Sequence, residues 1–289
     1  MTDSTPTIVV TGATGGLGRG AVDALLARGV DPASIVAAGR NPSKVDALQP
    51  LGVRTAVIDF TDPASLAAAF EGADTLVLVS ASEPGQRVQQ HINAIDAAKA
   101  AGVTHIVYTS APHADSSALI LAPEHKATEE YLQASGVTNT ILRNNWYNEN
   151  YERALPQIAA TGVYLASTGD GRVASASRLD YAEAIAVVLT SPETAGVVYE
   201  LNGDVAWTGS DFANTLTDVL GRDVHYESVS TEDHVAALSA AGLDAGTIGF
   251  LTGIDANIGD GLLDSSGNDL SRLLGRPTTP LADTLRTFV

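Results

Sequence analysis

The chain has 289 residues, 34 acidic against 16 basic side chains, a formal net charge of −18 and no cysteine. The acidic surface repels nucleic acid and anionic membranes, and without cysteine neither disulfides nor thiolate zinc sites can form. No apolar run approaches the ~18 residues of a membrane span, and the polar, acidic N-terminus is unlike an export signal, so we expect a cytoplasmic protein without a membrane partner.

The first predicted strand, residues 8–10, runs directly into a glycine-rich turn, and an amphipathic helix over residues 18–28 follows. The turn has G-x-x-G-x-x-G spacing and consists of Gly12, Ala13, Thr14, Gly15, Gly16, Leu17 and Gly18. Strand, glycine turn and helix together form a cradle for a pyrophosphate, because glycine permits close approach and the helix N-terminus offers N–H groups. We predict that this turn binds a dinucleotide. The alternative is a turn that only joins strand to helix.

The rest of the first half continues the alternation of strand and helix. Short segments rich in valine and isoleucine predict further buried strands over residues 35–38, 55–58, 75–79, 106–108 and 138–142. Helices are predicted over residues 42–48, 63–70, 86–101 and 124–134. This order predicts an α/β fold, a doubly wound parallel Rossmann sheet with helices on both faces.

The strand ends indicate which dinucleotide binds. The second strand ends at Arg40, where sites that prefer NAD place a carboxylate for the ribose hydroxyls and where arginine instead fits a 2′-phosphate. Arg40 therefore predicts NADP(H) in preference to NAD(H), and the alternative is a solvated arginine. Further predicted cofactor contacts follow the third and fourth strands, and each is also compatible with ordinary loop chemistry: Asp59, Phe60, Ser80, Ala81 and Ser82.

After about residue 150 the alternation stops. Strands are predicted over residues 163–166 and 197–201, and helices over 178–189, 210–220 and 231–241, the second of these capped by Ser210 or Asp211. Residues 245–263 are rich in glycine and other small residues, and we expect a mobile loop or cover there. We predict an NAD(P)-binding Rossmann domain over residues 1–150 and a smaller, intertwined substrate-binding lobe over 151–289, with the site in the cleft between them.

Several longer blocks carry a family resemblance. They are residues 82–87, 97–103 and 108–110, the run Leu-Arg-Asn-Asn-Trp-Tyr-Asn-Glu-Asn-Tyr at 142–151, and Gly-Arg-Pro-Thr-Thr-Pro-Leu at 275–281. With these blocks the chain resembles, over nearly its whole length, the NmrA-like group of atypical short-chain dehydrogenase/reductases. Within that group it is most similar to the bacterial NAD(P)H:quinone oxidoreductases, with triphenylmethane reductase as a related member.

The resemblance implies that Asn144, Asn145, Trp146 and Tyr147 line the nicotinamide end of the cofactor. We expect the two asparagines to contact the cofactor. Trp146 and Tyr147 would form a flat, partly polar wall suited to an aromatic acceptor. The alternative for Trp146 is a place in the core.

The usual Tyr-x-x-x-Lys dyad, which supplies the proton in ordinary short-chain dehydrogenases, is absent. By alignment His125 replaces the tyrosine and Glu129 the lysine, while Ser110 or Ala111 stands at the place of a helper serine. His125 is the candidate catalytic acid, since its unperturbed pKa lies near 6.5. The alternative is a histidine with a structural hydrogen bond.

The missing dyad suits hydride transfer from NADPH to a quinone-like acceptor. A quinone gives a stabilised hydroquinone anion, whereas a ketone gives a strongly basic alkoxide that needs a proton donor. Two alternatives stay open: an alcohol dehydrogenase or carbonyl reductase of broad, weakly stereoselective range, and a non-catalytic NADP(H)-binding redox sensor. The six histidines lack H-x-x-x-H spacing, so no metal is predicted. We expect a small-molecule quinone or carbonyl substrate and a monomer or homodimer.

Overall fold

The computed structural model describes residues 6–265 and 267–289. Residues 1–5, on which the argument against an export signal partly depended, lie outside the described residues. The chain divides into two compact units built from interleaved segments. The first unit comprises Met1–Ala114, Pro123–Asn144 and Arg178–Glu200, and the second comprises Asp115–Ala122, Asn145–Ser177 and Leu201–Val289. The two predicted domains stay a prediction.

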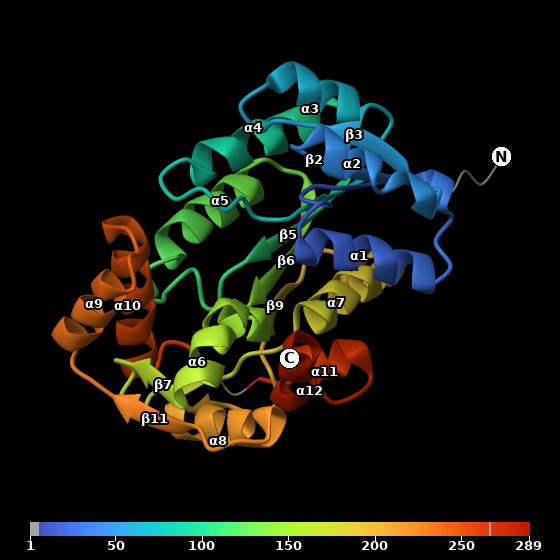
Figure 1. Cartoon of the computed structure of the whole chain (residues 1–289). Coiled ribbons are helices and arrows are strands. Elements are labelled where there is room, and N and C mark those ends of the chain that lie inside the picture. The colour runs from blue at the N-terminus through green and yellow to red at the C-terminus, as the bar shows by residue number, and fades with distance from the viewer. Residues whose placement is uncertain (1–5, 266) are drawn as a thin grey trace. The chain divides into compact units, whose positions relative to one another are not determined.

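A seven-stranded sheet runs through the first unit (Figure 1). Its strands are β1 (Ile8–Val10), β2 (Ile35–Gly39), β3 (Arg54–Val57), β4 (Thr75–Leu78), β5 (His105–Ser110), β6 (Thr138–Asn144) and β9 (Val198–Leu201). Their order is β3-β2-β1-β4-β5-β6-β9, and the first six pair in parallel. This is the Rossmann order, which reverses direction between β1 and β4, so the predicted α/β class is confirmed.

Helices cover both faces of this sheet (Figure 1). On one face lie α3 (Pro63–Phe70), α4 (Arg87–Ala100) and α5 (Ala122–Ala134), and on the other lie α1 (Gly16–Ala27) and α7 (Arg178–Thr190), while the short α2 (Pro42–Asp46) follows β2. Phe70 and Ile95 are fully buried against the strands. A Cβ on Gly20 would lie 2.9 Å from the Cβ of Ala182, so α1 and α7 pack closely because Gly20 has no side chain.

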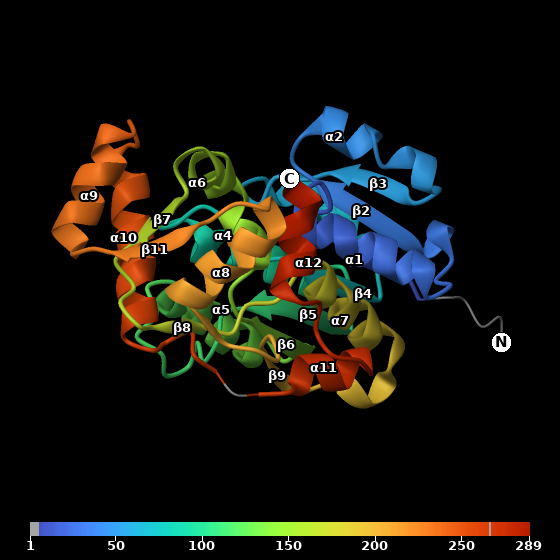
Figure 2. The ribbon, with the colours of Figure 1, turned by 60° about the horizontal axis from the view of Figure 1, so that its bottom comes forward.

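The second unit combines short strands with helices of 5 to 15 residues (Figure 2). They are α6 (Leu155–Thr161), β7 (Val163–Ala166), β8 (Arg172–Val173), β10 (Trp207–Thr208), α8 (Gly209–Leu220), β11 (His225–Ser228), α9 (Thr231–Ala240), α10 (Ala245–Gly259), α11 (Asp269–Leu274) and α12 (Leu281–Leu285). Strand β7 pairs in parallel with β11, and β8 pairs antiparallel with β10. Phe212 packs its ring 4.8 Å from Tyr164 and 5.1 Å from Trp207, which fixes an aromatic core.

Two sequence predictions in this unit were wrong. Residues 245–263 are largely the helix α10 rather than a loop, because Asp244 caps it by accepting hydrogen bonds from the N–H groups of Gly246 and Thr247, each at 3.0 Å. Burial of Ile248 and Ile258 then offsets the low helix propensity of its glycines. The cap of α8 is Thr208, whose hydroxyl and backbone form a capping box with Asp211.

Candidate functional site

The predicted cofactor residues of the first unit follow the carboxyl ends of neighbouring strands. The glycine turn follows β1, Arg40 follows β2, Asp59 and Phe60 come after β3, and residues 80–82 come after β4. Because the strands are parallel, these ends meet at one edge of the sheet. The reversal between β1 and β4 places the glycine turn at the position where Rossmann sheets bind dinucleotides.

The glycines of the turn have distinct structural roles. Gly12 has a φ of +62°, which a side chain would strain. A Cβ on Gly18 would lie 2.3 Å from the carbonyl oxygen of Gly12, so glycine is required for the helix to approach the strand. Gly15 and Gly16 are exposed at the start of α1, which has neither a side-chain cap nor an acidic residue in its first turn. The initial N–H groups of α1 therefore face a place that an anion fits.

Arg40 is exposed at the end of β2, and its guanidinium donates a hydrogen bond to Glu83 in the loop after β4. Asp59 accepts hydrogen bonds from the N–H and hydroxyl of Thr61 at 2.8 and 2.7 Å, and these bonds lower the pKa of its carboxyl. The carbonyl of Phe60 accepts a hydrogen bond from Asn93 at 2.8 Å. Arg40 follows β2, and Asp59 and Phe60 come after β3, while their contacts with a cofactor stay a prediction; Glu83, the partner of Arg40, was missed by sequence reasoning.

The loop after β4 is fastened by polar side chains. The N–H of Ser80 donates to the hydroxyl of Thr109 at 2.9 Å, and the N–H of Ala81 donates to Nε2 of His91 at 2.9 Å. Arg87 donates to the carbonyl of Ala81 at 2.7 Å and forms a 2.7 Å ion pair with Glu124. The predicted cofactor residues Ser80 and Ala81 are therefore held by fixed partners, and Ser82 is exposed between them and Glu83.

His125 is buried in the first unit, with 5% of its surface exposed. Its Nδ1 lies 2.7 Å from the hydroxyl of Tyr108, which is itself fully buried. Burial lowers the pKa of His125 to about 3, and the charge of Arg87 acts in the same direction. His125 is therefore neutral near pH 7, and these observations favour the structural alternative over the catalytic acid.

Beside it, Ser110, Glu129 and Arg143 form a hydrogen-bonded network. Ser110 donates its hydroxyl hydrogen to Glu129 at 2.5 Å, and Arg143 binds both oxygens of Glu129 at 3.0 and 2.7 Å. Arg143 also donates to Glu200 at 2.8 Å. Burial by itself lowers the pKa of Arg143, but the hydrogen bonds to Glu129 and Glu200 outweigh it, so the net shift is upward and Arg143 stays charged. The sequence signal for this network was an arginine directly after the apolar pair Ile141 and Leu142 of β6.

The residues predicted for the nicotinamide end fall at and after the end of β6. Asn144 is buried as the last residue of β6, in the first unit. Asn145 belongs to the second unit and donates from its amide to Asn202 at 2.8 Å, while its own oxygen accepts from the N–H of Trp146 at 2.7 Å. Trp146 and Tyr147 are half-buried, and their backbone pairs with Ala176. Asn145 thus has a structural role in the second unit.

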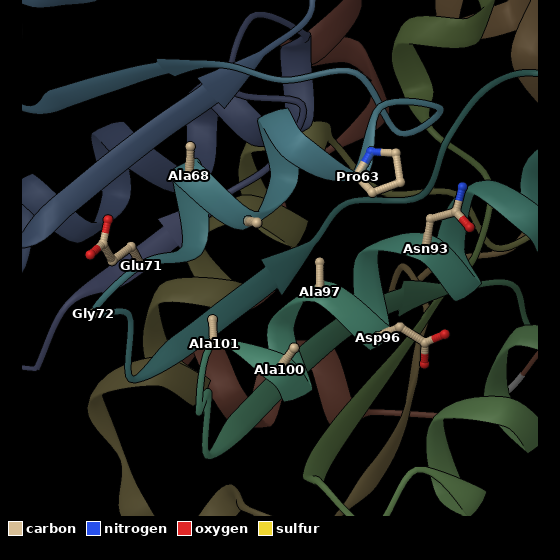
Figure 3. A pocket seen from close by; sticks show the side chains of 10 residues that line it. Pro63, Ala68, Glu71, Gly72, Asn93, Asp96, Ala97, Ala100 and Ala101 are labelled. Carbon is tan, nitrogen blue, oxygen red and sulfur yellow. The ribbon is translucent and has the colours of Figure 1, made fainter.

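A cavity of about 750 Å³ lies between α3 and α4 (Figure 3). Half of its lining residues are alanine, and two of its polar side chains have structural partners: Asn93 donates to the carbonyl of Phe60, and Asp96 accepts from Tyr131. None of the predicted cofactor residues lines it. In the described part of the chain, no group of three or more histidine, aspartate or glutamate side chains could hold a metal ion. Within the same residues, no helix is long and apolar enough to cross a bilayer.

Comparison with known proteins defines the class. The chain matches the model of the NAD(P)H-binding family over residues 12–192 and belongs to that family. It is 45% identical to quinone oxidoreductase 2 of Escherichia coli (strain K12), over 96% of this chain and 97% of that protein.

Two solved structures extend the comparison. An NADPH-dependent quinone oxidoreductase of E. coli, complexed with NADPH, has a TM-score of 0.92 at 45% identity and covers 97% of this chain and 99% of its own. Triphenylmethane reductase of Citrobacter sp., complexed with NADP(H), has a TM-score of 0.93 at 33% identity and covers 98% of this chain and 100% of its own. The predicted resemblance to these two kinds of reductase is confirmed.

The glycine turn fits the cofactor that the family binds. The place that a Cβ on Gly18 would take is filled by the backbone of Gly12, and the exposed backbone of Gly15 and Gly16 stands at the uncapped start of α1. A pyrophosphate needs this combination of close approach and N–H groups at a helix start, to which Gly16 contributes, since the N–H of Gly15 donates to the carbonyl of Gly12 at 2.9 Å. Arg40 adds a cation beside it in a chain whose net charge is −18.

Proposed function

We propose that this protein is a cytoplasmic, NADPH-dependent oxidoreductase that reduces quinones. Support comes from quinone oxidoreductase 2 of E. coli, a relative at 45% identity whose solved structure is described as NADPH-dependent and complexed with NADPH. Arg40 at the end of β2 supports NADPH over NADH, because a guanidinium matches a 2′-phosphate in shape and charge. The backbone of Gly15 and Gly16 would hold the pyrophosphate.

The lack of a proton-donating side chain among the described residues at the edge of the sheet is the observation that favours a quinone over a ketone as acceptor. His125 is buried and neutral, and Ser110 donates its hydroxyl hydrogen to Glu129, which also binds Arg143. NADPH, when bound, supplies a hydride. A ketone would become a strongly basic alkoxide that needs a positioned proton donor, whereas a quinone becomes a stabilised hydroquinone anion. These side chains therefore suit a quinone better than a simple ketone.

We further propose that Asn144 and Asn145 lie near the nicotinamide and that Trp146 and Tyr147 contact the acceptor ring. The half-buried indole and phenol supply flat surface for an aromatic acceptor. The hydrogen bond from Asn145 to Asn202 and the backbone pairing with Ala176 would keep that surface in a fixed orientation. The substrate is a small molecule, and the protein acts as a monomer or a homodimer.

Loss of NADPH absorbance with purified protein tests this function. The acceptors are 1,4-benzoquinone and a small aliphatic ketone, with protein-free and heat-denatured samples to subtract direct reduction. We expect kcat/KM for the quinone to exceed that for the ketone about 100-fold or more, since a positioned acid contributes at least that much to ketone reduction. Preferential turnover of the ketone would support a carbonyl reductase instead. Turnover of neither acceptor would support a redox sensor.

A further inference from the structure

We propose that Glu83 is a cofactor-specificity residue. Its carboxylate holds Arg40 and competes with the 2′-phosphate of NADPH for that guanidinium, so it limits the preference of this chain for NADPH over NADH. The inference rests on the proposed function, which assigns Arg40 to the 2′-phosphate.

Both carboxylate oxygens of Glu83 are engaged. One accepts a hydrogen bond from the guanidinium of Arg40, and the other accepts from the amide of Gln90 at 2.8 Å. Gln90 is buried on α4, with 5% of its surface exposed. Glu83 is therefore directed at Arg40 by a partner inside the fold. The hydrogen bonds from Arg40 and Gln90 also lower the pKa of Glu83, which keeps it ionised at neutral pH.

The loop that carries Glu83 is fixed on both sides. Before it, the N–H of Ala81 is held by His91, and after it Arg87 binds the carbonyl of Ala81 and the carboxylate of Glu124. The N–H of Gly85 donates to the other oxygen of Glu124 at 2.8 Å. These bonds fasten the loop backbone to α4 and α5, so Glu83 meets Arg40 from a loop that is held in place.

The ion pair of Arg40 and Glu83 contributes little to stability, but its carboxylate affects how strongly an anion is repelled. The side chains of Arg40 and Glu83 are 69% and 35% exposed, and exposed ion pairs contribute little to stability. A phosphate can therefore displace the carboxylate from Arg40. The 2′-phosphate carries about −1.5 to −2 charges near pH 7, so an ionised Glu83 beside it repels NADPH far more than NADH.

Asp59 is the other carboxylate near Arg40, and the geometry assigns it a different role. Its Oδ1 is occupied by the N–H and hydroxyl of Thr61, which shape the turn after β3. Glu83 instead bonds to the guanidinium itself. Substitution of Glu83 therefore removes the competitor without changing that turn.

Calorimetric titration of the full chain tests the proposal. The proteins are wild type, Glu83→Gln, which keeps an oxygen for the amide of Gln90, and Glu130→Gln, which removes one exposed charge from α5. Each is titrated with NADPH and NADH, and with the fragments 2′,5′-ADP and 5′-AMP. For Glu83→Gln we expect the Kd for NADPH and 2′,5′-ADP to fall about three- to ten-fold. The Kd for NADH and 5′-AMP should change less than about two-fold, and Glu130→Gln should match wild type.

Failure of this inference can be distinguished from failure of the proposed function. If wild type binds NADPH but Glu83→Gln binds it with an unchanged or larger Kd, or gains equally for NADH, this inference alone is overturned. An equal gain in Glu130→Gln would assign the effect to net charge and would overturn it as well. If wild type binds neither dinucleotide, the proposed function fails together with it. Glu83→Ala, made in parallel, should shift the Kd for NADPH in the same direction.

Discussion

His91 and His125 show how burial sets the chemistry of single residues in the first unit. Both rings are buried, and burial lowers the pKa of each to about 3. His91 accepts from the N–H of Ala81 through Nε2 and contacts Thr128 through Nδ1 at 3.0 Å. His125 contacts Tyr108. Histidine often catalyses proton transfer, but these two histidines make structural contacts here.

These neutral histidines make stability depend on pH. In the unfolded chain a histidine binds a proton once the pH falls below about 6.5, whereas folded His125 does so only near pH 3. The free energy of unfolding therefore decreases as the pH falls from 6.5 toward 3. When the pH is lowered from 7 to 5, the free energy of unfolding of His125→Phe should decrease by roughly 2 kcal/mol less than that of wild type. Urea denaturation at both pH values measures the difference. His225→Gln, at an exposed position, should behave as wild type, and an unchanged slope in His125→Phe would contradict the account.

The sequence predicted where single residues lie in the fold better than it predicted which residues they bind. Arg40 was found because its place after a strand has a known meaning, and the structure places it there. The partners Glu83 and Arg143 were missed, because they lie 43 residues from Arg40 and 14 from Glu129 and no local pattern joins them. Such pairs depend on how strands order themselves in the sheet.

At the scale of elements, the turn between β1 and α1 is the most demanding segment. Its glycines satisfy a positive φ at Gly12 and a close contact at Gly18, and they leave the start of α1 uncapped. The helices α2, α3, α8, α9 and α10 each begin with a side-chain cap instead. Helices α4, α6, α11 and α12 also lack a side-chain cap, so the uncapped start does not set α1 apart, and the close contact at Gly18 is what requires glycine in this turn.

Two glycine substitutions separate these roles. Gly18→Ala should destabilise the protein by about 1–3 kcal/mol, because its Cβ meets the Gly12 carbonyl at 2.3 Å. Gly249→Ala in α10 should stabilise it by about 0.5–1 kcal/mol, because nothing lies within 4 Å of the added Cβ. Urea midpoints of both variants provide the comparison. Equal stability of the two would show that the turn does not need glycine at residue 18.

Elements with strong local signals could be predicted, and those that depend on packing could not. The bounds of the strands in the first unit differ from prediction only at their ends, since apolar runs with valine and isoleucine identify strands. The predicted burial was wrong for β3, which lies at the edge of the sheet with Arg54 and Val57 exposed. Helix α10 was missed because its glycines indicate a loop, and only burial of Ile248 and Ile258 within the second unit stabilises it as a helix. Propensity was a weak guide there.

At the scale of the whole molecule, strand order brings the site together. The residues after β1, β2, β3 and β4 share one edge because the order is β3-β2-β1-β4, and each crossover returns the chain to the same end of the sheet. Alternation of strands and helices predicted this class, and from the sequence we expected some segments after residue 150 to return to the Rossmann body without identifying which; residues 178–200 belong to the first unit. The net charge of −18 makes the few cations at that edge more significant for an anionic cofactor.

The central claim is that NADPH binds at the glycine turn with Arg40 on its 2′-phosphate. Calorimetric titration of wild type and Arg40→Ala with NADPH and NADH tests it most directly. We predict saturable binding to wild type, tighter for NADPH. Arg40→Ala should raise the Kd for NADPH roughly ten-fold or more and that for NADH less than about two-fold. No heat with either dinucleotide, or an equal loss for both in Arg40→Ala, would contradict the account.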